Sequence, residues 1–388
     1  MMNRRDFVKN ATLAVDTVVG GAPLSTASPL ESRHQIAGAT SNKLPRWKGF
    51  NLTDFNTPDP SSARRSTTGD HLKWMRDWGF DFVRLPISYP YYLKFDRSKP
   101  ITPDEVYQID DSSVDRIDHL VQLAHQYDLH VCLNLHRAPG YCINAGFNEP
   151  YNLWRDEEAQ NAFYFHWNMW ARRYKHVSPK KISFDLLNEP CLREDMNDQH
   201  SKNGPIPGEL YRKVAKGAVD AIRRENTHRL VIADGNNVGN LPTPELSDLN
   251  VSQSCRGYYP HLISHYKAPW ANKDPEHMAV PVYPGQVGDQ YVGRQMLEDY
   301  YKPWIDIKNK GVGVHCGECG CWNKTPHDVF LAWFGDVIDI LATNEIGFAL
   351  WEFIGDFGIL NSGRTDVKYE DWYGYKLDKK LLDLLKSK

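Results

Sequence analysis

Two segments of the chain carry a carboxylic acid at the end of an apolar run. Glu189 and Pro190 follow the largely apolar residues 182–187, and Pro190 cannot continue a paired central strand because proline lacks a backbone N–H. Glu318 follows Gly317 after a second apolar run. Either glutamate could be an ordinary solvated loop acid. If the two carboxyl groups met, they could share acid–base and nucleophilic chemistry, because the charge of one carboxylate raises the pKa of the other.

The elements around these segments alternate between short apolar runs and longer stretches of helical periodicity. This alternation predicts a parallel sheet with helices between its strands. We expect helices over residues 68–78, 113–127, 157–174, 208–224, 290–309, 327–342 and 377–385. We expect strands over residues 47–52, 82–88, 130–135, 181–187, 229–233, 253–258, 312–316 and 346–351. This α/β pattern matches one (β/α)8 TIM barrel better than two domains.

The residues that end these strands are polar where the preceding residues are apolar. In a (β/α)8 barrel the C-terminal strand ends meet at one mouth, where active sites are assembled. Glu189 ends the fourth strand and Glu318 the seventh, so both should face this mouth. The other candidates at strand ends are Arg84, Asn134, His136, Asn188, Tyr258 and Trp351. Long loops should wall the mouth, at residues 89–97, 139–154, 260–287 and 354–375.

Two glutamates across one mouth suit the hydrolysis of a glycosidic bond. One carboxyl group must be protonated, to protonate the leaving oxygen, while the other is ionised. A separation of about 5 Å lets the ionised group attack the sugar and gives retention, whereas about 6.5 to 9.5 Å admits a water and gives inversion. In the first case the attack removes the nucleophile's charge, so the pKa of the acid should fall and the same group can act as a base.

Several of these candidates have a structural explanation as well. Arg84 could form an ion pair inside the barrel, and a lone strand-end histidine such as His136 is more often structural than catalytic. Trp351 could belong to the core, since tryptophan is often largely buried. Their joint placement at successive strand ends favours the functional interpretation.

Taken in order, the motifs resemble those of glycoside hydrolase family 5, the cellulase family. The resemblance covers residues 47–385 and rests on the segments Gly49-Phe-Asn-Leu52, Arg84-Leu-Pro-Ile87, Leu133-Asn-Leu-His136-Arg-Ala-Pro-Gly140, Leu187-Asn-Glu-Pro190, Gly317-Glu318 and Leu350-Trp-Glu352. It implies a retaining barrel in which Glu189 is the acid/base and Glu318 is the nucleophile.

The resemblance also implies roles for the neighbouring residues. Asn188 would bind the 2-hydroxyl group of the sugar beside the scissile bond, where contacts strengthen in the transition state. Arg84 and Tyr258 would keep the nucleophile ionised and oriented. His136 would line the subsite of the attacked sugar, and Trp351 would be its stacking platform.

One position departs from the family's pattern. The family commonly has a histidine two residues before the tyrosine of the sixth strand, whereas this chain has Arg256 before Tyr258. A guanidinium group does not titrate near neutrality and attracts anionic neighbours. The role of Arg256 therefore stays open at this point, as does the choice between Tyr258 and Tyr259 as the matching residue.

Composition narrows the class of protein. The net charge of −3 gives no electrostatic reason to expect nucleic acid or an anionic membrane as a partner. The chain has 12 Trp, 20 Tyr and 15 Phe, and aromatic rings in loops suit the flat faces of sugars. Beyond the N-terminal region, no run approaches the roughly 20 apolar residues of a membrane span.

The N-terminus resembles a twin-arginine export signal. Arg4 and Arg5 precede a mildly apolar stretch over residues 11–22, although Asp16 interrupts it, and a disordered basic tail is the alternative. We expect cleavage near Ala22 or Ala27 and a soluble exported protein, periplasmic or extracellular. The expected organisation is a signal over residues 1–27, a linker over 28–45 and the catalytic barrel over 46–388.

The seven cysteines leave at least one thiol unpaired, which excludes a complete disulfide framework. Cys316, Cys319 and Cys321, beside His315, could suggest zinc, but their spacing has no second matching pair. Small buried apolar residues are the preferred interpretation.

These observations predict a monomeric enzyme without metal or cofactor that hydrolyses a β-linked polysaccharide or oligosaccharide with retention. An endo-β-1,4-glucanase is the preferred activity, with β-mannanase and β-1,3-glucanase activities as alternatives that only the loops could distinguish. A non-catalytic carbohydrate-binding barrel or a Cys/His metal-binding protein is the alternative from another class. The presence of both Glu189 and Glu318 argues against a pure binding protein.

Overall fold

The computed structural model describes residues 44–62 and 66–388. The expected export signal and most of the expected linker lie outside these ranges, so both remain predictions. Within the described ranges, none of the helices has the length and apolar character needed to cross a membrane.

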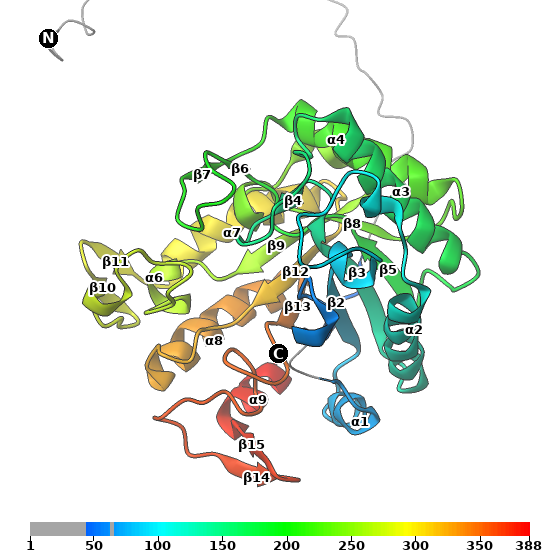
Figure 1. Ribbon diagram of the computed structural model, residues 1–388. Helices are drawn as coiled ribbons and strands as arrows, with labels where there is room; N and C mark the ends of the chain where they lie inside the picture. The colour runs from blue at the N-terminus through cyan, green and yellow to red at the C-terminus, as the bar shows by residue number, and fades with distance from the viewer. Residues whose placement is uncertain (1–43, 63–65) are drawn as a thin grey trace, which may run out of the picture. The chain divides into compact units, whose positions relative to one another are not determined.

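Eight parallel strands form a closed barrel (Figure 1). The sheet runs β2-β1-β13-β12-β9-β8-β5-β3, and parallel pairing of β3 with β2 closes the ring. The barrel strands are β1 (Lys48–Asn51), β2 (Phe82–Ser88), β3 (His130–Ala138), β5 (Ile182–Asp185), β8 (Val231–Asp234), β9 (Ser252–Gly257), β12 (Val314–Cys319) and β13 (Gly347–Leu350). The predicted (β/α)8 fold is confirmed.

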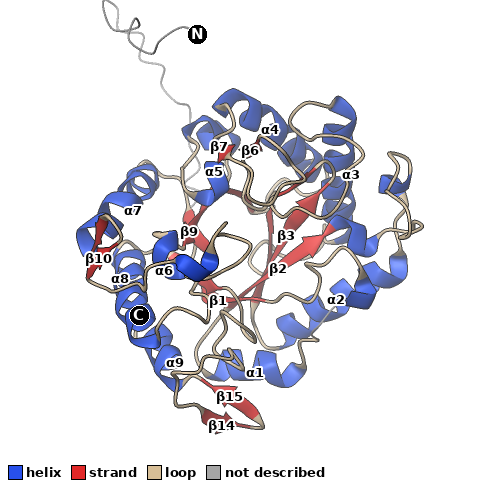
Figure 2. Cartoon of the chain, turned by 60° about the vertical axis from the view of Figure 1, so that its left-hand side comes forward, coloured by secondary structure: helices blue, strands red, loops and turns tan. Residues whose placement is uncertain are grey.

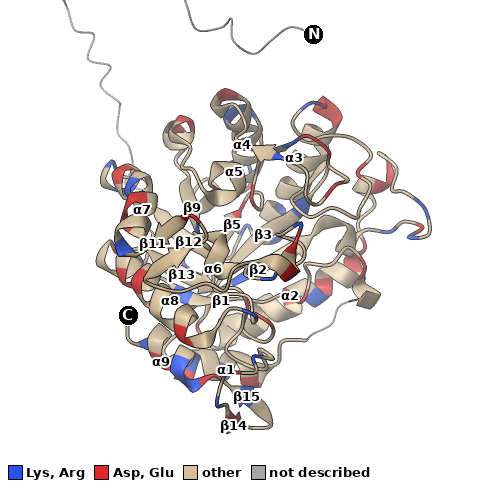
Figure 3. Cartoon of the chain, turned by 90° about the vertical axis from the view of Figure 1, so that its left-hand side faces the viewer, with Lys and Arg blue, Asp and Glu red and all other residues tan. Residues whose placement is uncertain are grey.

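Helices surround this barrel (Figure 2). They are α1 (Gly69–Asp77), α2 (Asp111–Gln126), α3 (Glu157–Arg173), α4 (Gly208–Arg223), α5 (Asn236–Gly239), α6 (His261–Ser264), α7 (Arg294–Asn309), α8 (His327–Thr343) and α9 (Lys379–Lys386). Both signs of charge occur along α7 and α9 (Figure 3), where ion pairs four residues apart join Lys302 to Asp306 and Lys379 to Asp383.

The loops contain several short elements. The additional strands are β4 (Tyr141–Cys142), β6 (Leu192–Arg193), β7 (Asn203–Gly204), β10 (Gly285–Val287), β11 (Gln290–Val292), β14 (Glu370–Trp372) and β15 (Tyr375–Leu377). Short 3-10 helices cover Pro60–Ser62, Tyr89–Tyr92, Glu105–Tyr107, Pro244–Leu249 and Pro275–His277.

Several predicted boundaries differ from the structure, and three of them bear on the site and its loops. The helix expected from residue 290 begins at Arg294, because residues before it form the β10–β11 hairpin, which turns at Gly288 with a φ of 62°. The fourth barrel strand ends at Asp185, three residues before Asn188. The seventh continues to Cys319, so Glu318 lies inside the strand, where the register shifts between Cys316 and Glu318. Such a bulge redirects a side chain.

Apolar and aromatic side chains fill the end of the barrel where the strands begin. Trp47, Phe82, Cys132, Ile232 and Ala349 form one buried cluster there, and the Trp47 ring stacks on His130 with 3.9 Å between ring centroids. This packing closes that end, so the polar strand-end residues can meet a ligand only at the opposite mouth.

Close contact between β1 and β2 requires glycine at position 49. A Cβ atom on Gly49 would lie 1.7 Å from the carbonyl oxygen of Phe82. We expect Gly49→Ala to lower the free energy of unfolding by at least about 1–3 kcal/mol, since backbone atoms must move apart. Gly204→Ala is the control, because a Cβ there meets no atom within 4 Å. Urea denaturation of both variants measures the difference, and equal stabilities would contradict this account.

Candidate active site

Arg84 lies at the centre of the site, on β2 and almost fully buried. Its Nε donates to Asp185 Oδ2 at 2.9 Å, and its Nη1 donates to Glu318 Oε1 at 2.6 Å. Nη1 and Nη2 also donate to the side-chain oxygens of Asn51 and Asn188, at 3.0 and 2.9 Å. One guanidinium group therefore joins four barrel positions. Its ion pair with Asp185 agrees with a structural role, and its contact with Glu318 agrees with the predicted one.

Arg256, the residue that departs from the family's pattern, forms a second such centre on β9. Its Nε donates to Glu189 Oε1 at 3.0 Å, and its Nη2 lies 3.5 Å from Glu318 Oε1. Two further nitrogen–oxygen contacts pair it with both carboxylate oxygens of Asp234. A single cation thus contacts both glutamates, a geometry that the motif alone could not reveal.

Two glycines lie beside this arginine. A Cβ atom on Gly239 would lie 2.5 Å from Arg256 Cγ, and one on Gly317 would lie 3.3 Å from Arg256 Nη1 and 2.4 Å from Ser254 Oγ. Gly239 also has a φ of 74°, which favours glycine. Gly239 therefore leaves room for the aliphatic part of the Arg256 side chain, whereas Gly317 mainly leaves room for Ser254.

The two arginines fix the orientation of the Asn188 side chain. Asn188 Oδ1 accepts from Arg84 Nη2 at 2.9 Å and from Arg256 Nη2 at 3.0 Å. Guanidinium groups only donate, so the oxygen must be the atom that faces them. Asn188 Nδ2 is buried and has no hydrogen-bond partner within the described part of the chain. The two arginines thus use the oxygen of this side chain and leave its N–H group unpaired.

Glu189 is held in a left-handed backbone conformation, with a φ of 49°. Its N–H donates to Asp234 Oδ2 at 2.9 Å, and its carbonyl oxygen accepts from the Tyr141 hydroxyl group at 2.6 Å. Such a conformation is costly for a residue other than glycine, and these two bonds offset the cost. They direct the carboxyl group toward Arg256.

Burial raises the pKa of Glu189 to about 7, and the neighbouring charge of Glu318 adds to this effect. The sequence predicts the partner's charge as the cause of this shift, whereas loss of solvation is the larger cause. The positive charge of Arg256 acts in the opposite direction, because it favours the ionised carboxylate, but its effect on the pKa of Glu189 is smaller. The carboxyl group therefore changes its protonation state near neutral pH.

Two buried aspartates, Asp185 and Asp234, lie next to the arginines and bring negative charge to their guanidinium groups. Burial raises the pKa of Asp185 to about 7, helped by the charge of Asp234. Burial acts in the same direction on Asp234, but the Arg256 and Arg84 guanidinium groups outweigh it and lower the pKa of Asp234. Sequence reasoning missed both aspartates: Asp185 interrupts an apolar run, and Asp234 directly follows one, but neither stands at a position that singles it out.

His136 and Trp351 form one wall of the site. Their rings stack with centroids 5.5 Å apart and an interplanar angle of 17°. Burial lowers the pKa of His136 to about 4, so the ring is neutral at ordinary pH. His136 Nδ1 has no partner among the described residues. On the other side, the Tyr258 hydroxyl group donates to Glu318 Oε2 at 3.3 Å, which favours Tyr258 over Tyr259 as the matching tyrosine.

A cleft of about 520 Å³ brings most of the predicted residues together. Its lining includes His136, Glu189, Tyr258, Glu318 and Trp351. Arg84 donates to the lining residue Glu318, and Asn188 directly precedes the lining residue Glu189, but neither Arg84 nor Asn188 lines the cleft itself. Asn134 donates to the backbone oxygen of Asp185 at 3.3 Å and does not line the cleft either. Among the loop residues of the lining, His261, His265, Trp270 and Phe357 fall in loops that the sequence predicts as walls of the mouth. Sequence reasoning missed the loop after the fourth strand, which contributes Arg193, Gln199 and Asn203.

The cysteine segment lies in the core. All seven cysteines are buried and none forms a disulfide. Within residues 44–62 and 66–388, no three His, Cys, Asp or Glu side chains are placed to hold a metal ion together. The geometry around Cys316, Cys319 and Cys321 is consistent with the preferred interpretation, small apolar packing residues.

A closed (β/α)8 barrel with two glutamates at its mouth defines the class of the protein, an O-glycoside hydrolase. The family model described as cellulase (glycosyl hydrolase family 5) matches residues 40–356. The chain belongs to this family, and the resemblance seen in the sequence is confirmed.

Individual relatives agree with this assignment. Endoglucanase C from Acetivibrio thermocellus is 26% identical over 329 residues, which cover 78% of this chain and 89% of that protein. Cellodextrinase A from Ruminococcus flavefaciens is 28% identical over 307 residues, which cover 77% and 83%. A crystal structure described as a glycoside hydrolase is 36% identical, has a TM-score of 0.79, and is matched over 88% of this chain and 99% of its own length.

The raised pKa of Glu189 makes a prediction about stability. The folded state holds this proton between pH 4.5, the ordinary value, and about 7, while the unfolded state releases it, so rising pH destabilises the fold across this window. We expect wild type to lose about 3 kcal/mol relative to Glu189→Gln from pH 4.5 to pH 8. Chemical denaturation of both proteins at several pH values measures it. Parallel pH profiles for the two proteins would exclude the shift.

Proposed function

We propose that the protein is a retaining endo-β-1,4-glucanase that uses Glu189 as acid/base and Glu318 as nucleophile. The contact of Arg256 with both carboxyl groups carries the proposal, at 3.0 Å to Glu189 and 3.5 Å to Glu318. These contacts place the two carboxyl groups beside each other, and burial together with the charge of Glu318 outweighs the cation and raises the pKa of Glu189 to about 7, so Glu189 can be protonated while Glu318 attacks.

In the first step, Glu189 protonates the leaving oxygen while Glu318 attacks the anomeric carbon. Arg84 and Tyr258 donate to the two oxygens of Glu318 at 2.6 and 3.3 Å, so they fix the direction of its carboxyl group. The products of this step are a covalent glycosyl-enzyme and a free chain end.

In the second step, Glu189 removes a proton from a water molecule that attacks the anomeric carbon, and the bond from this carbon to Glu318 breaks, which releases the sugar and restores both carboxyl groups. Esterification eliminates the charge of Glu318, which is one cause of the raised pKa of Glu189. The pKa of Glu189 therefore falls once the intermediate forms, and the group becomes a base when a base is needed.

The surrounding residues bind and orient the attacked sugar. We assign to the unpartnered Asn188 Nδ2 a hydrogen bond to its 2-hydroxyl group, where hydrogen bonds strengthen in the transition state. Trp351, backed by the neutral His136 ring, offers a flat aromatic face to the sugar. Neither role requires a metal or cofactor.

The substrate class rests on the relatives, whose names include endoglucanases and a cellodextrinase. The test is release of reducing ends from carboxymethylcellulose, mannan and laminarin. We expect the highest kcat/KM on the β-1,4-glucan, together with a rapid fall in its viscosity, as internal cleavage requires. Activity confined to mannan or to the β-1,3-glucan would refute the assignment.

The catalytic assignment makes a separate prediction about Glu318. We expect Glu318→Ala to lower kcat by several orders of magnitude, and azide to restore activity with the opposite anomeric configuration, since azide attacks from the side that the carboxylate leaves empty. NMR of the glycosyl azide reports the configuration. Near wild-type activity in the variant, with the fold verified by circular dichroism, would refute the nucleophile role.

A further inference from the structure

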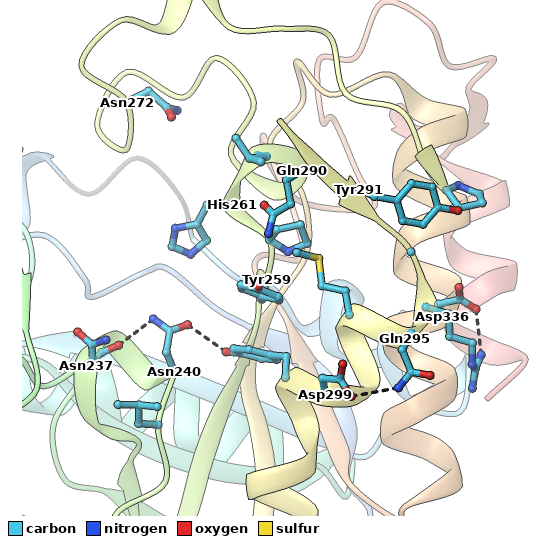
Figure 4. Close-up of a pocket in the computed structure, with 18 residues that line it drawn as sticks. Asn237, Asn240, Tyr259, His261, Asn272, Gln290, Tyr291, Gln295, Asp299 and Asp336 are labelled. Carbon is cyan, nitrogen blue, oxygen red and sulfur yellow. Dashed lines mark hydrogen bonds and ion pairs between the residues drawn. The ribbon is translucent and has the colours of Figure 1, made fainter. Parts of the chain in front are cut away.

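A second cavity, larger than the catalytic cleft, lies on its flank. It has a volume of about 1160 Å³, against about 520 Å³ for the cleft. The α5 turn, the loop after β9, the β10–β11 hairpin and helices α7 and α8 contribute its lining, as Figure 4 shows in part. We call this cavity the lateral pocket.

The lateral pocket adjoins the cleft on the side of Glu189. His261 lines both cavities, and the consecutive residues Asn237 and Val238 line the lateral pocket and the cleft, respectively. Val238 N–H donates to the carbonyl oxygen of Pro190 at 3.2 Å, which ties this turn to the segment that carries Glu189. The sugar units attached to the leaving oxygen, on the side of Glu189, would therefore lie close to the lateral pocket.

Aromatic rings supply apolar faces in the pocket. Tyr259 stacks on Tyr300, with centroids 4.4 Å apart and planes 6° apart, and the Tyr300 hydroxyl group donates to Asn240 Oδ1 at 3.0 Å. Tyr291, on the hairpin strand β11, is 65% exposed. Figure 4 shows Tyr259 between the asparagines Asn237 and Asn240 on one side and Tyr291 on the other.

Hydrogen-bonding groups surround these rings, and some are already ordered. Asn240 Nδ2 donates to the carbonyl oxygen of Asn237 at 2.8 Å, and Gln295 donates to Asp299 at 3.0 Å. Within the described ranges the Gln290 side chain has no hydrogen-bond partner, and Figure 4 shows it above Tyr259. Amide and carboxylate groups next to rings suit a ligand with many hydroxyl groups.

The charges in the pocket disfavour an anionic ligand. Arg294 is the one arginine or lysine among its lining residues, and its nitrogens contact Glu298 at 2.8 Å and Asp336 and Asp339 at 2.9 Å. These three carboxylates neutralise the positive charge of Arg294. Asp299 and Asp336 leave the lining neutral to slightly acidic, as expected for a neutral polyhydroxylated ligand.

We propose that the lateral pocket binds sugar units of the glucan on the leaving-group side of the cleavage point, with Tyr291 as a stacking surface and Gln290 as a hydrogen-bonding partner. This inference rests on the proposed function, because it assigns the leaving side to Glu189. It makes the β10–β11 hairpin a determinant of preference for long chains over short ones.

The experiment compares a long and a short substrate. Cellohexaose can extend past Glu189 into the lateral pocket, whereas the nitrophenyl group of p-nitrophenyl β-cellobioside is too short to do so. We expect Tyr291→Ala and the double variant Tyr291→Ala/Gln290→Ala to lower the ratio of kcat/KM for cellohexaose to that for the aryl cellobioside. One lost stacking surface corresponds to a change of about threefold to tenfold.

Tyr373→Ala is the matched control, since Tyr373 is 77% exposed and lies between β14 and β15, a hairpin outside both cavities. An unchanged ratio in the Tyr291 variants, with wild type active on both substrates, would overturn the lateral pocket and leave the proposed function standing. An equal fall in the control would overturn it as well. Wild type inactive on both substrates would instead refute the proposed function.

Discussion

Two buried guanidinium groups hold four carboxyl groups together at the mouth of this barrel. Arg84 pairs with Asp185 and Glu318, while Arg256 pairs with Asp234 and contacts both glutamates. Desolvating any one of these ions alone would cost several kcal/mol. Each therefore depends on the others, and the surrounding strands must place all six groups together. The site is in this sense one electrostatic unit.

The barrel topology meets this requirement because parallel pairing places residues that are distant in sequence side by side on neighbouring strands. β12, which bears Glu318, pairs with β9, which bears Arg256, and β9 pairs with β8, which bears Asp234. The parallel register brings Glu318 directly opposite Arg256. Strand pairing thus brings Glu318 and Asp234 within reach of Arg256 through the positions of their backbones. Loops add the cleft walls, where shape can vary without disturbing the ion pairs.

The repeating pattern of apolar strands and amphipathic helices was sufficient to predict the barrel and the face on which the glutamates meet. The polar residues at strand ends were visible for the same reason, since they interrupt apolar runs. The position of Glu318 within its strand was not predictable, because it depends on a register shift that leaves no mark in the apolar pattern. The carboxylates that Arg256 contacts were not predictable either. Nothing in the sequence near Arg256 indicates them, because these contacts form only when the barrel closes.

The space around Arg256 has a consequence for the history of the family. The arginine fits because Gly239 has no side chain: a Cβ there would lie 2.5 Å from Arg256 Cγ. A relative with the common histidine at this position and a larger residue in place of Gly239 could not acquire the arginine by one substitution without crowding its side chain. The glycine must come first. Changes at positions 239 and 256 are therefore ordered in time, and we expect lineages with this arginine to share the glycine.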